Sequence, residues 1–218
     1  NESGALSDVV PNYWRLYSDN LTWTGAFITT ADMVLQQFGD DRPVKEHYDA
    51  MKKWMVYMKN RYGKDGIITK DRYGDWCMPP ESLEIIHSKD PSRKTAAGVL
   101  STAYYHYLAK KMVRFATIAG HQEDAGYWST EAEESKEAFN REYFNEEAGN
   151  YANNTVTANL LPLWFDMVPE EREADVLDAI IRKTEGEFNG HVSTGVVGIQ
   201  SLMRTLTVFG KGELAYRI

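Results

Sequence analysis

The chain has very little of several features that mark particular classes of protein. Its 218 residues include one cysteine, Cys77, so no disulfide can form within the chain. Lys and Arg number 24 against 32 Asp and Glu, which gives a formal net charge of -8 at pH 7. The basic residues are scattered, so the clustered positive patch of nucleic-acid-binding proteins is missing. We expect no nucleic-acid partner.

Long hydrophobic runs are also missing. The longest strongly apolar run, TGVVGIQSLM at residues 194–203, is far shorter than a bilayer crossing. The opening NESGALSD shows neither the basic nor the apolar region of a signal peptide. We therefore expect no membrane partner. Because the first residue is Asn1 and not Met, we expect a chain processed or excised from a longer protein.

The residues that are present indicate one helical domain spanning 1–218. Hydrophobic residues make up 43% of the chain and charged residues 26%, enough for one substantial core. Four segments are apolar or small on nearly all sides: 24–38, 95–119, 156–165 and 194–209. A short break follows each of them, and Gly39, Gly120 and Gly210 fit the left-handed position that ends a helix.

The segment after each break is more polar or shorter. A one-sided apolar stripe recurs at helical spacing in two of these segments, through Val44, Tyr48, Met51, Met55 and Met58, and through Ala125, Trp128, Ala132, Ser135 and Phe139. Helices that are apolar all round need cover on every side, whereas one-sided helices can form an outer layer. The alternation predicts inner and outer rings of helices. An ordinary antiparallel bundle or an α-solenoid is the alternative.

The longest connection, about residues 62–94, contains RYGDWCMPP. Within it GIITKDRYGDW, residues 66–76, suggests a short hairpin. The pair Asp75-Trp76 suits sugar binding, because an aromatic ring can lie against the sugar C–H face while a carboxylate binds hydroxyls. Core packing of Trp76 is the alternative.

Other chemistries find little support. The histidines are dispersed and there is no HExxH motif or Cys pair, so we expect no metal site. No G-x-S-x-G motif or phosphate loop occurs, and the glycines of HVSTGVVG more simply let a helix begin close to its neighbours. Many glycosidases use two carboxylates. Five acids lie near breaks or loops without any pair standing out: Asp19, Asp75, Glu81, Glu84 and Glu187.

Four blocks in order carry a resemblance to a known family. They are LTWTGAFITTADMVLQQFGDDRPVKEHYDAMKKWMVYM, YGDW, YANNTVTANLLPLWFDMVPEE and FNGHVSTGVVGIQSLMRTLTVFGKGELAYRI. Together they resemble the catalytic domain of bacterial α-L-rhamnosidases, glycoside hydrolase family 78, over essentially the whole chain. The resemblance implies an all-α fold, part of an (α/α)6 barrel with about four of six helical hairpins. It also implies inverting hydrolysis of terminal α-L-rhamnosyl residues from a rhamnose-containing glycoside, without a cofactor.

The resemblance also suggests roles for four residues. Trp23 in LTWTGA and Trp76 in YGDW match family tryptophans that line the sugar pocket. Asp75 either binds a hydroxyl or braces its loop. His191 in NGHVSTG opens an inner helix and either faces the pocket mouth or caps the turn. Where relatives commonly have WGDA, this chain has Trp-Thr-Gly-Ala, so an Asp common in relatives is missing at Gly25.

Both catalytic motifs of the family are missing from the sequence. The general acid is expected upstream of Asn1, in a segment like DERxGWxGD, and the general base after Ile218, in a segment like GATTxWE. The chain therefore contains no catalytic residue, and we expect it to be inactive alone and to self-associate through exposed inner helices. A binding or scaffold module built as an α-solenoid, or another α/α-barrel glycosidase, is the alternative. The resemblance indicates a bacterial source and leaves both a cytoplasmic and an exported location open.

Overall fold

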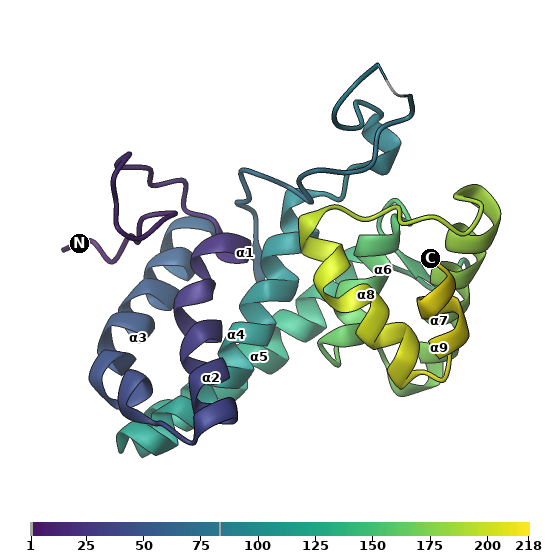
Figure 1. The fold of residues 1–218 in the computed structure, drawn as a ribbon. Coiled ribbons are helices and arrows are strands. Elements are labelled where there is room, and N and C mark those ends of the chain that lie inside the picture. The colour runs from purple at the N-terminus through teal and green to yellow at the C-terminus, as the bar shows by residue number, and fades with distance from the viewer. Residues whose placement is uncertain (1, 83) are drawn as a thin grey trace. The chain divides into compact units, whose positions relative to one another are not determined.

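The computed structural model describes residues 2–82 and 84–218, which are mainly helical (Figure 1). Its contacts divide the chain into two compact units. Unit 1 consists of Asn1–Arg72 and Ser101–Phe139, and unit 2 of Tyr73–Leu100 and Asn140–Ile218. The prediction of a single domain over 1–218 stays a prediction. Within the described residues, no helix combines the length and apolar character that a membrane crossing needs.

Unit 1 is built from two long helical pairs and a small hairpin. Its elements are α1 (Leu21–Thr24), α2 (Ala26–Phe38), α3 (Arg42–Tyr62), β1 (Gly63–Lys64), β2 (Ile67–Ile68) and most of α4 (Ala97–Ala119) and α5 (Gln122–Tyr143). Figure 1 shows α2 and α3 packed side by side. Between them Gly39 has a φ of +66° and caps α2 in the left-handed conformation, and Gly120 after α4 has a φ of +84°. Both predicted helix ends are confirmed.

The core of unit 1 follows the predicted stripes. All five stripe residues of α3 are buried, together with Trp54, and on α5 Trp128, Ala132, Ser135 and Phe139 are buried while Ala125 is half-buried. A buried acid links three helices of this core. Glu131 on α5 accepts hydrogen bonds from Lys59 on α3 and, at 2.7 Å, from the Tyr105 hydroxyl on α4. Burial first, and then this carboxylate, raise the pKa of Tyr105.

Unit 2 packs its helices around α6. Its elements are β3 (Phe144–Asn145), β4 (Asn150–Tyr151), α6 (Val156–Trp164), α7 (Glu173–Arg182), α8 (Val196–Val208), α9 (Gly212–Arg217), the 3₁₀ turns Pro91–Arg93 and Glu170–Arg172, and the π turn Lys183–Glu187. Eight consecutive α6 residues, Val156 to Leu163, are buried. Both α7 and α8 pack against α6, and α9 packs against α8 (Figure 1).

The predicted alternation therefore gives four helical pairs along the described chain, α2–α3, α4–α5, α6–α7 and α8–α9. The inner helices differ in their cover. On α6 all sides are buried, whereas α2 exposes Met33 and Phe38 and α8 exposes Val208. Exposed apolar side chains thus occur on two of the predicted inner helices, whereas the open arc of hairpins that led to this expectation stays a prediction. Self-association through these flanks remains a prediction.

The predicted hairpin lies earlier than residues 66–76. Gly63 pairs with Ile68 and Lys64 with Ile67, so only β2 belongs to the predicted stretch. The correction follows from turn chemistry. Asp65 and Gly66 both have positive φ, as the Asp-Gly of a two-residue hairpin turn requires, and this fixes the strands on either side of them. Each hairpin is then tied to the next helix: the N–H of Ile68 donates to Thr102 on α4 at 3.0 Å, and that of Tyr151 to Asn159 on α6 at 2.8 Å.

Candidate functional site

The carboxylate of Asp75 accepts four hydrogen bonds within unit 2. Its Oδ1 accepts from the N–H groups of Val197 at 2.8 Å and Gly198 at 3.1 Å. Its Oδ2 accepts from the N–H of Gly195 at 2.8 Å and from the hydroxyl of Thr157. Asp75 is only 6% exposed. One carboxylate thus joins the YGDW segment to α6 and to the start of α8.

Asp75 caps the start of α8, although it lies more than 100 positions earlier in the sequence. The residue before the helix is Gly195, which has no side chain to satisfy the free N–H groups of the first turn. Asp75 satisfies them instead, and its negative charge lies at the positive end of the helix dipole. These contacts fit the alternative in which Asp75 braces its own loop. Hydroxyl binding by this residue remains a prediction.

Two glycines make this close approach possible. A Cβ on Gly195 would lie 2.2 Å from the carbonyl oxygen of Asp75 and 2.3 Å from that of Trp76. A Cβ on Gly198 would lie 2.4 Å from the Thr157 hydroxyl oxygen. The interpretation of the HVSTGVVG glycines as allowing close helix packing is confirmed.

The ring of Trp76 projects from this anchored segment. It is 47% exposed, which does not fit the core-packing alternative. Its centroid lies 6.0 Å from that of the His87 ring, and the two planes meet at 58°. Its carbonyl oxygen accepts a hydrogen bond from the N–H of Val196. Trp76 therefore combines a fixed backbone with an accessible indole, as a wall of a sugar pocket would require.

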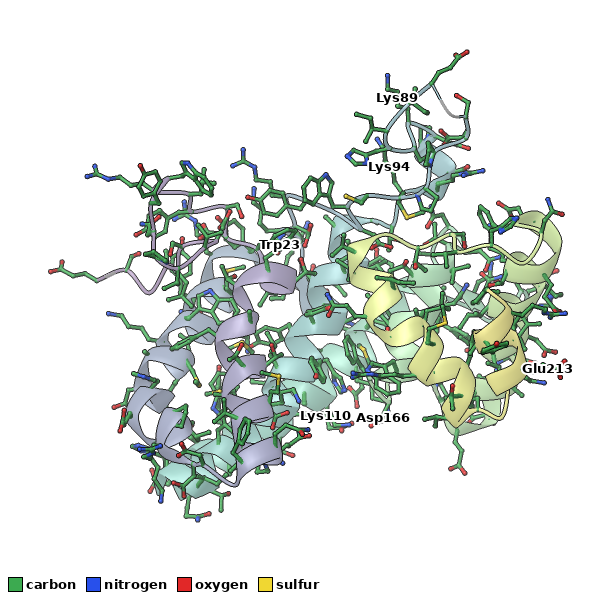
Figure 2. All side chains as sticks on the ribbon, in the orientation of Figure 1. Trp23, Lys89, Lys94, Lys110, Asp166 and Glu213 are labelled. Carbon is green, nitrogen blue, oxygen red and sulfur yellow. The ribbon has the colours of Figure 1, made fainter. Side chains whose placement is uncertain are left out.

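Trp23 is held by a separate network in unit 1. Asn20 is fully buried and caps α1, because its Oδ1 accepts from the N–H of Trp23 at 2.8 Å and from the Thr22 hydroxyl. The Asn20 side-chain amide donates to Asp71 at 2.9 Å. Figure 2 shows the half-buried Trp23 on this first helical turn. Its role in sugar binding stays a prediction.

The other acids near breaks differ in their surroundings. Glu81, Glu84 and Glu187 are exposed. The Ser88 hydroxyl, which donates to Glu81, holds the pKa of Glu81 at about 2, so this carboxyl is ionised near neutral pH. Asp19 is buried and accepts from the hydroxyls of Tyr57 at 2.9 Å and Tyr62 at 2.5 Å.

His191 lies outside the helix that it was expected to open. α8 begins at Val196, and His191 is exposed in the segment before it. Its N–H donates to the carbonyl of Phe188 at 2.9 Å and closes a turn. The helix begins where the Trp76 carbonyl accepts from the N–H of Val196 and Asp75 accepts from those of Val197 and Gly198. A sugar contact of His191 stays a prediction.

Sequence reasoning missed four residues of these networks: Thr157, His87, Asn20 and Asp71. Asn20 carried a usable signal, since Asn directly before a helical segment is a preferred cap. Thr157 looked like any small residue of an inner helix. Among residues 2–82 and 84–218, no three His, Cys, Asp or Glu side chains are grouped so that they could hold a metal ion.

Comparison with known proteins gives the family of the chain. The model of the bacterial α-L-rhamnosidase six-hairpin glycosidase domain matches residues 1–218. An α-L-rhamnosidase of Formosa agariphila is 31% identical over 192 residues, which is 83% of this chain and 19% of that protein. One from Streptomyces avermitilis is 27% identical over 216 residues, 99% of this chain and 19% of that protein.

Solved structures agree with this match. An α-L-rhamnosidase from Dictyoglumus thermophilum is 33% identical with a TM-score of 0.89, over 100% of this chain and 24% of its own. The Streptomyces avermitilis enzyme, solved with L-rhamnose, is 26% identical with a TM-score of 0.87, over 100% of this chain and 19% of its own. The chain therefore spans about a fifth to a quarter of these relatives. The predicted fold class, all-α and part of an (α/α)6 barrel, is confirmed, and the chain belongs to the bacterial α-L-rhamnosidase six-hairpin glycosidase domain family.

Proposed function

We propose that residues 1–218 form part of the catalytic domain of an α-L-rhamnosidase that removes terminal α-L-rhamnosyl residues from glycosides or polysaccharides. The observation that carries the proposal is the half-exposed indole of Trp76 on a backbone anchored by Asp75, in a chain of the rhamnosidase family. The flat apolar face of an indole fits the C–H face of a sugar ring, and the 6-methyl group of rhamnose adds apolar surface to that contact.

The reaction that we propose is an inverting hydrolysis. A general acid protonates the glycosidic oxygen as the bond to the anomeric carbon breaks, while a general base takes a proton from the water that attacks the opposite face. The sequence contains neither family motif for these carboxylates. We propose that both come from outside residues 1–218, and that this chain supplies pocket walls, Trp23 and Trp76 among them.

The reaction is tested with 4-nitrophenyl α-L-rhamnoside. The 218-residue chain should release no 4-nitrophenol, whereas the protein encoded by the complete reading frame around it should do so. Proton NMR during early turnover should show β-L-rhamnose as the first product, as inversion requires. Release by the 218-residue chain would refute the assignment of both carboxylates to other segments, and α-L-rhamnose as first product would refute inversion.

The pocket role of Trp76 is tested in the complete protein. Trp76→Ala should raise KM by about tenfold, since a lost aromatic contact of about 1.4 kcal/mol corresponds to that factor. Trp14→Ala is the matched control, because Trp14 is also exposed but lies in the segment before α1. An unchanged KM in Trp76→Ala would remove this residue from the pocket.

A further inference from the structure

We propose that Asp75 is a positioning residue, which fixes the Trp76 indole relative to α6 and α8 and does not itself contact substrate. The catalytic consequence of this inference rests on the rhamnosidase function proposed above. The positioning itself rests only on contacts within unit 2, and it can be tested without any activity.

The first argument is that the carboxylate has no acceptor capacity left. An ionised carboxylate offers about four lone-pair sites. Four donors already use them, the N–H groups of Gly195, Val197 and Gly198 and the hydroxyl of Thr157. A sugar hydroxyl would have to displace one of these donors from a residue that is 6% exposed. The displaced N–H would then be left buried without a partner, at a cost comparable to the bond gained.

The second argument is that hydrogen bonds hold the chain on both sides of Trp76. The Asp75 side chain holds the residue before it, and the bond from Val196 N–H to the Trp76 carbonyl holds the peptide after it. Cys77 then has a φ of +63°, which turns the chain at the next residue. The backbone of Trp76 is therefore held at both ends, and its side chain is the part left exposed.

The third argument is that a neutral amide cannot replace this carboxylate. Asparagine at position 75 would offer one acceptor oxygen and would direct its NH2 group at N–H donors. Charge-assisted bonds to the start of α8 would be lost, and at least one buried N–H of its first turn would be unsatisfied. We therefore expect Asp75→Asn to make the YGDW segment more mobile while α6 and α8 still form.

The first experiment measures the segment directly in the 218-residue chain. Cys77 is its only cysteine, is exposed, and directly follows Trp76. A nitroxide attached to Cys77 reports the mobility of this segment through the width of its electron paramagnetic resonance line. The line should be broad in the labelled chain without substitutions and clearly narrower in labelled Asp75→Asn. Asp178→Asn is the matched control, since it makes the same change at an exposed site of α7, and its line should stay broad. Equal line widths in all three chains would overturn the proposal.

The second experiment separates positioning from hydroxyl binding in the complete protein. If Asp75 acts through Trp76, Asp75→Asn should lower kcat/KM on the aryl rhamnoside by up to about tenfold, the loss expected for Trp76→Ala, but change it little when Trp76 is already Ala. Independent, multiplicative losses in the double variant would overturn the proposal. Thr157→Val removes one of the four bonds and should show the same dependence on Trp76 more weakly. It serves as the test if Asp75→Asn fails to fold.

The two experiments also separate this inference from the proposed function. If the complete protein does not hydrolyse rhamnosides, the proposed function fails, and the spin-label result still decides whether Asp75 positions Trp76. If hydrolysis occurs and the labelled line does not narrow, only the positioning role is lost.

Discussion

The N–H of Val196 donates a hydrogen bond of 2.7 Å to the carbonyl oxygen of Trp76. Val196 is the first residue of α8, so the accessible tryptophan of YGDW is tied to a helix that lies 120 positions further along the chain. The contact depends on the absence of a side chain at Gly195, which lies between the two segments.

Substitution of Gly195 by Ala should therefore separate these segments. The new Cβ would lie 2.2 Å and 2.3 Å from two carbonyl oxygens, which cannot move without shifting Asp75 and Trp76. We expect a loss of about 1–3 kcal/mol in the free energy of unfolding, measured by urea denaturation, as for other overpacked sites. Gly212→Ala is the control, because its Cβ would meet nothing within 4 Å, and it should stay within about 0.5 kcal/mol. Equal stabilities of the two variants would contradict the close packing.

Substitution of Asn20 by Ala should destabilise unit 1. It removes the α1 cap, so the Trp23 N–H loses its Asn20 acceptor and the Asp71 carboxylate loses its Asn20 amide donor. We expect a loss of about 1–3 kcal/mol on chemical denaturation. Asn60→Ala provides the comparison, because Asn60 is exposed on α3 and alanine favours helix there. A loss in Asn60→Ala as large as that in Asn20→Ala would argue against the cap.

Substitution of Asp32 by Ala should be among the most damaging changes in unit 1. Asp32 is buried on α2 and pairs with Lys111 and, at 2.6 Å, with Arg114, both on α4. Its removal leaves the mostly buried Lys111 without this anion, so we expect a loss of about 3–5 kcal/mol by guanidinium denaturation.

Two further variants identify the cause of that loss. Adding Lys111→Met to Asp32→Ala should restore part of the stability, because no unpaired cation then remains buried at that point. Lys45→Ala breaks the exposed pair with Asp41 and should cost only about 0.3–0.5 kcal/mol. If the added Lys111→Met lowers stability further, the loss comes from packing and not from charge.

Stability should fall at alkaline pH, in part because of Tyr57. Burial, and then the Asp19 carboxylate that accepts from its hydroxyl, raise the pKa of Tyr57 to about 12, whereas an unfolded tyrosine titrates near pH 10. The folded state therefore holds this proton more tightly. The stabilisation is complete below about pH 10 and is lost as the pH rises toward about 12.

Tyr57→Phe should reduce this alkaline slope of the free energy of unfolding. The slope should not vanish, because burial also raises the pKa of Tyr48, Tyr105 and Tyr151. Urea titrations at a series of pH values would measure the change. Tyr216→Phe is the matched control, since it removes the same hydroxyl from a side chain that is 95% exposed. An identical slope in Tyr57→Phe would contradict the shifted pKa.

The sequence was informative wherever structure depends on neighbouring residues. Period-3.6 stripes located α3 and α5, and glycines after α2 and α4 marked true left-handed helix ends. For Trp76 the sequence left core packing and a pocket wall open, and its 47% exposure does not fit core packing.

What could not be foreseen depends on residues far apart in the chain. The partners of Asp75 lie 82 to 123 positions away, and nothing local distinguishes this carboxylate from an ordinary loop acid. The late start of α8, which leaves His191 outside the helix, coincides with the same long-range bonds. The hairpin register is a different case. Asp65-Gly66 carried a local signal, and the predicted stretch missed it because it began at Gly66.

The two small hairpins have a consequence for how the family can vary. Each follows an outer helix, and each fixes the second residue of its second strand to a polar side chain of the next inner helix, Thr102 or Asn159. The two hairpins differ in the connection from the second strand to the next helix, which is residues 69–96 before α4 and residues 152–155 before α6. Ile68 fixes one end of the longer connection and Asp75 binds the start of α8, so the residues of this connection outside YGDW can change in length at low entropic cost. The exposed Trp76 therefore lies in a segment of this connection that cannot be replaced without disturbing α8.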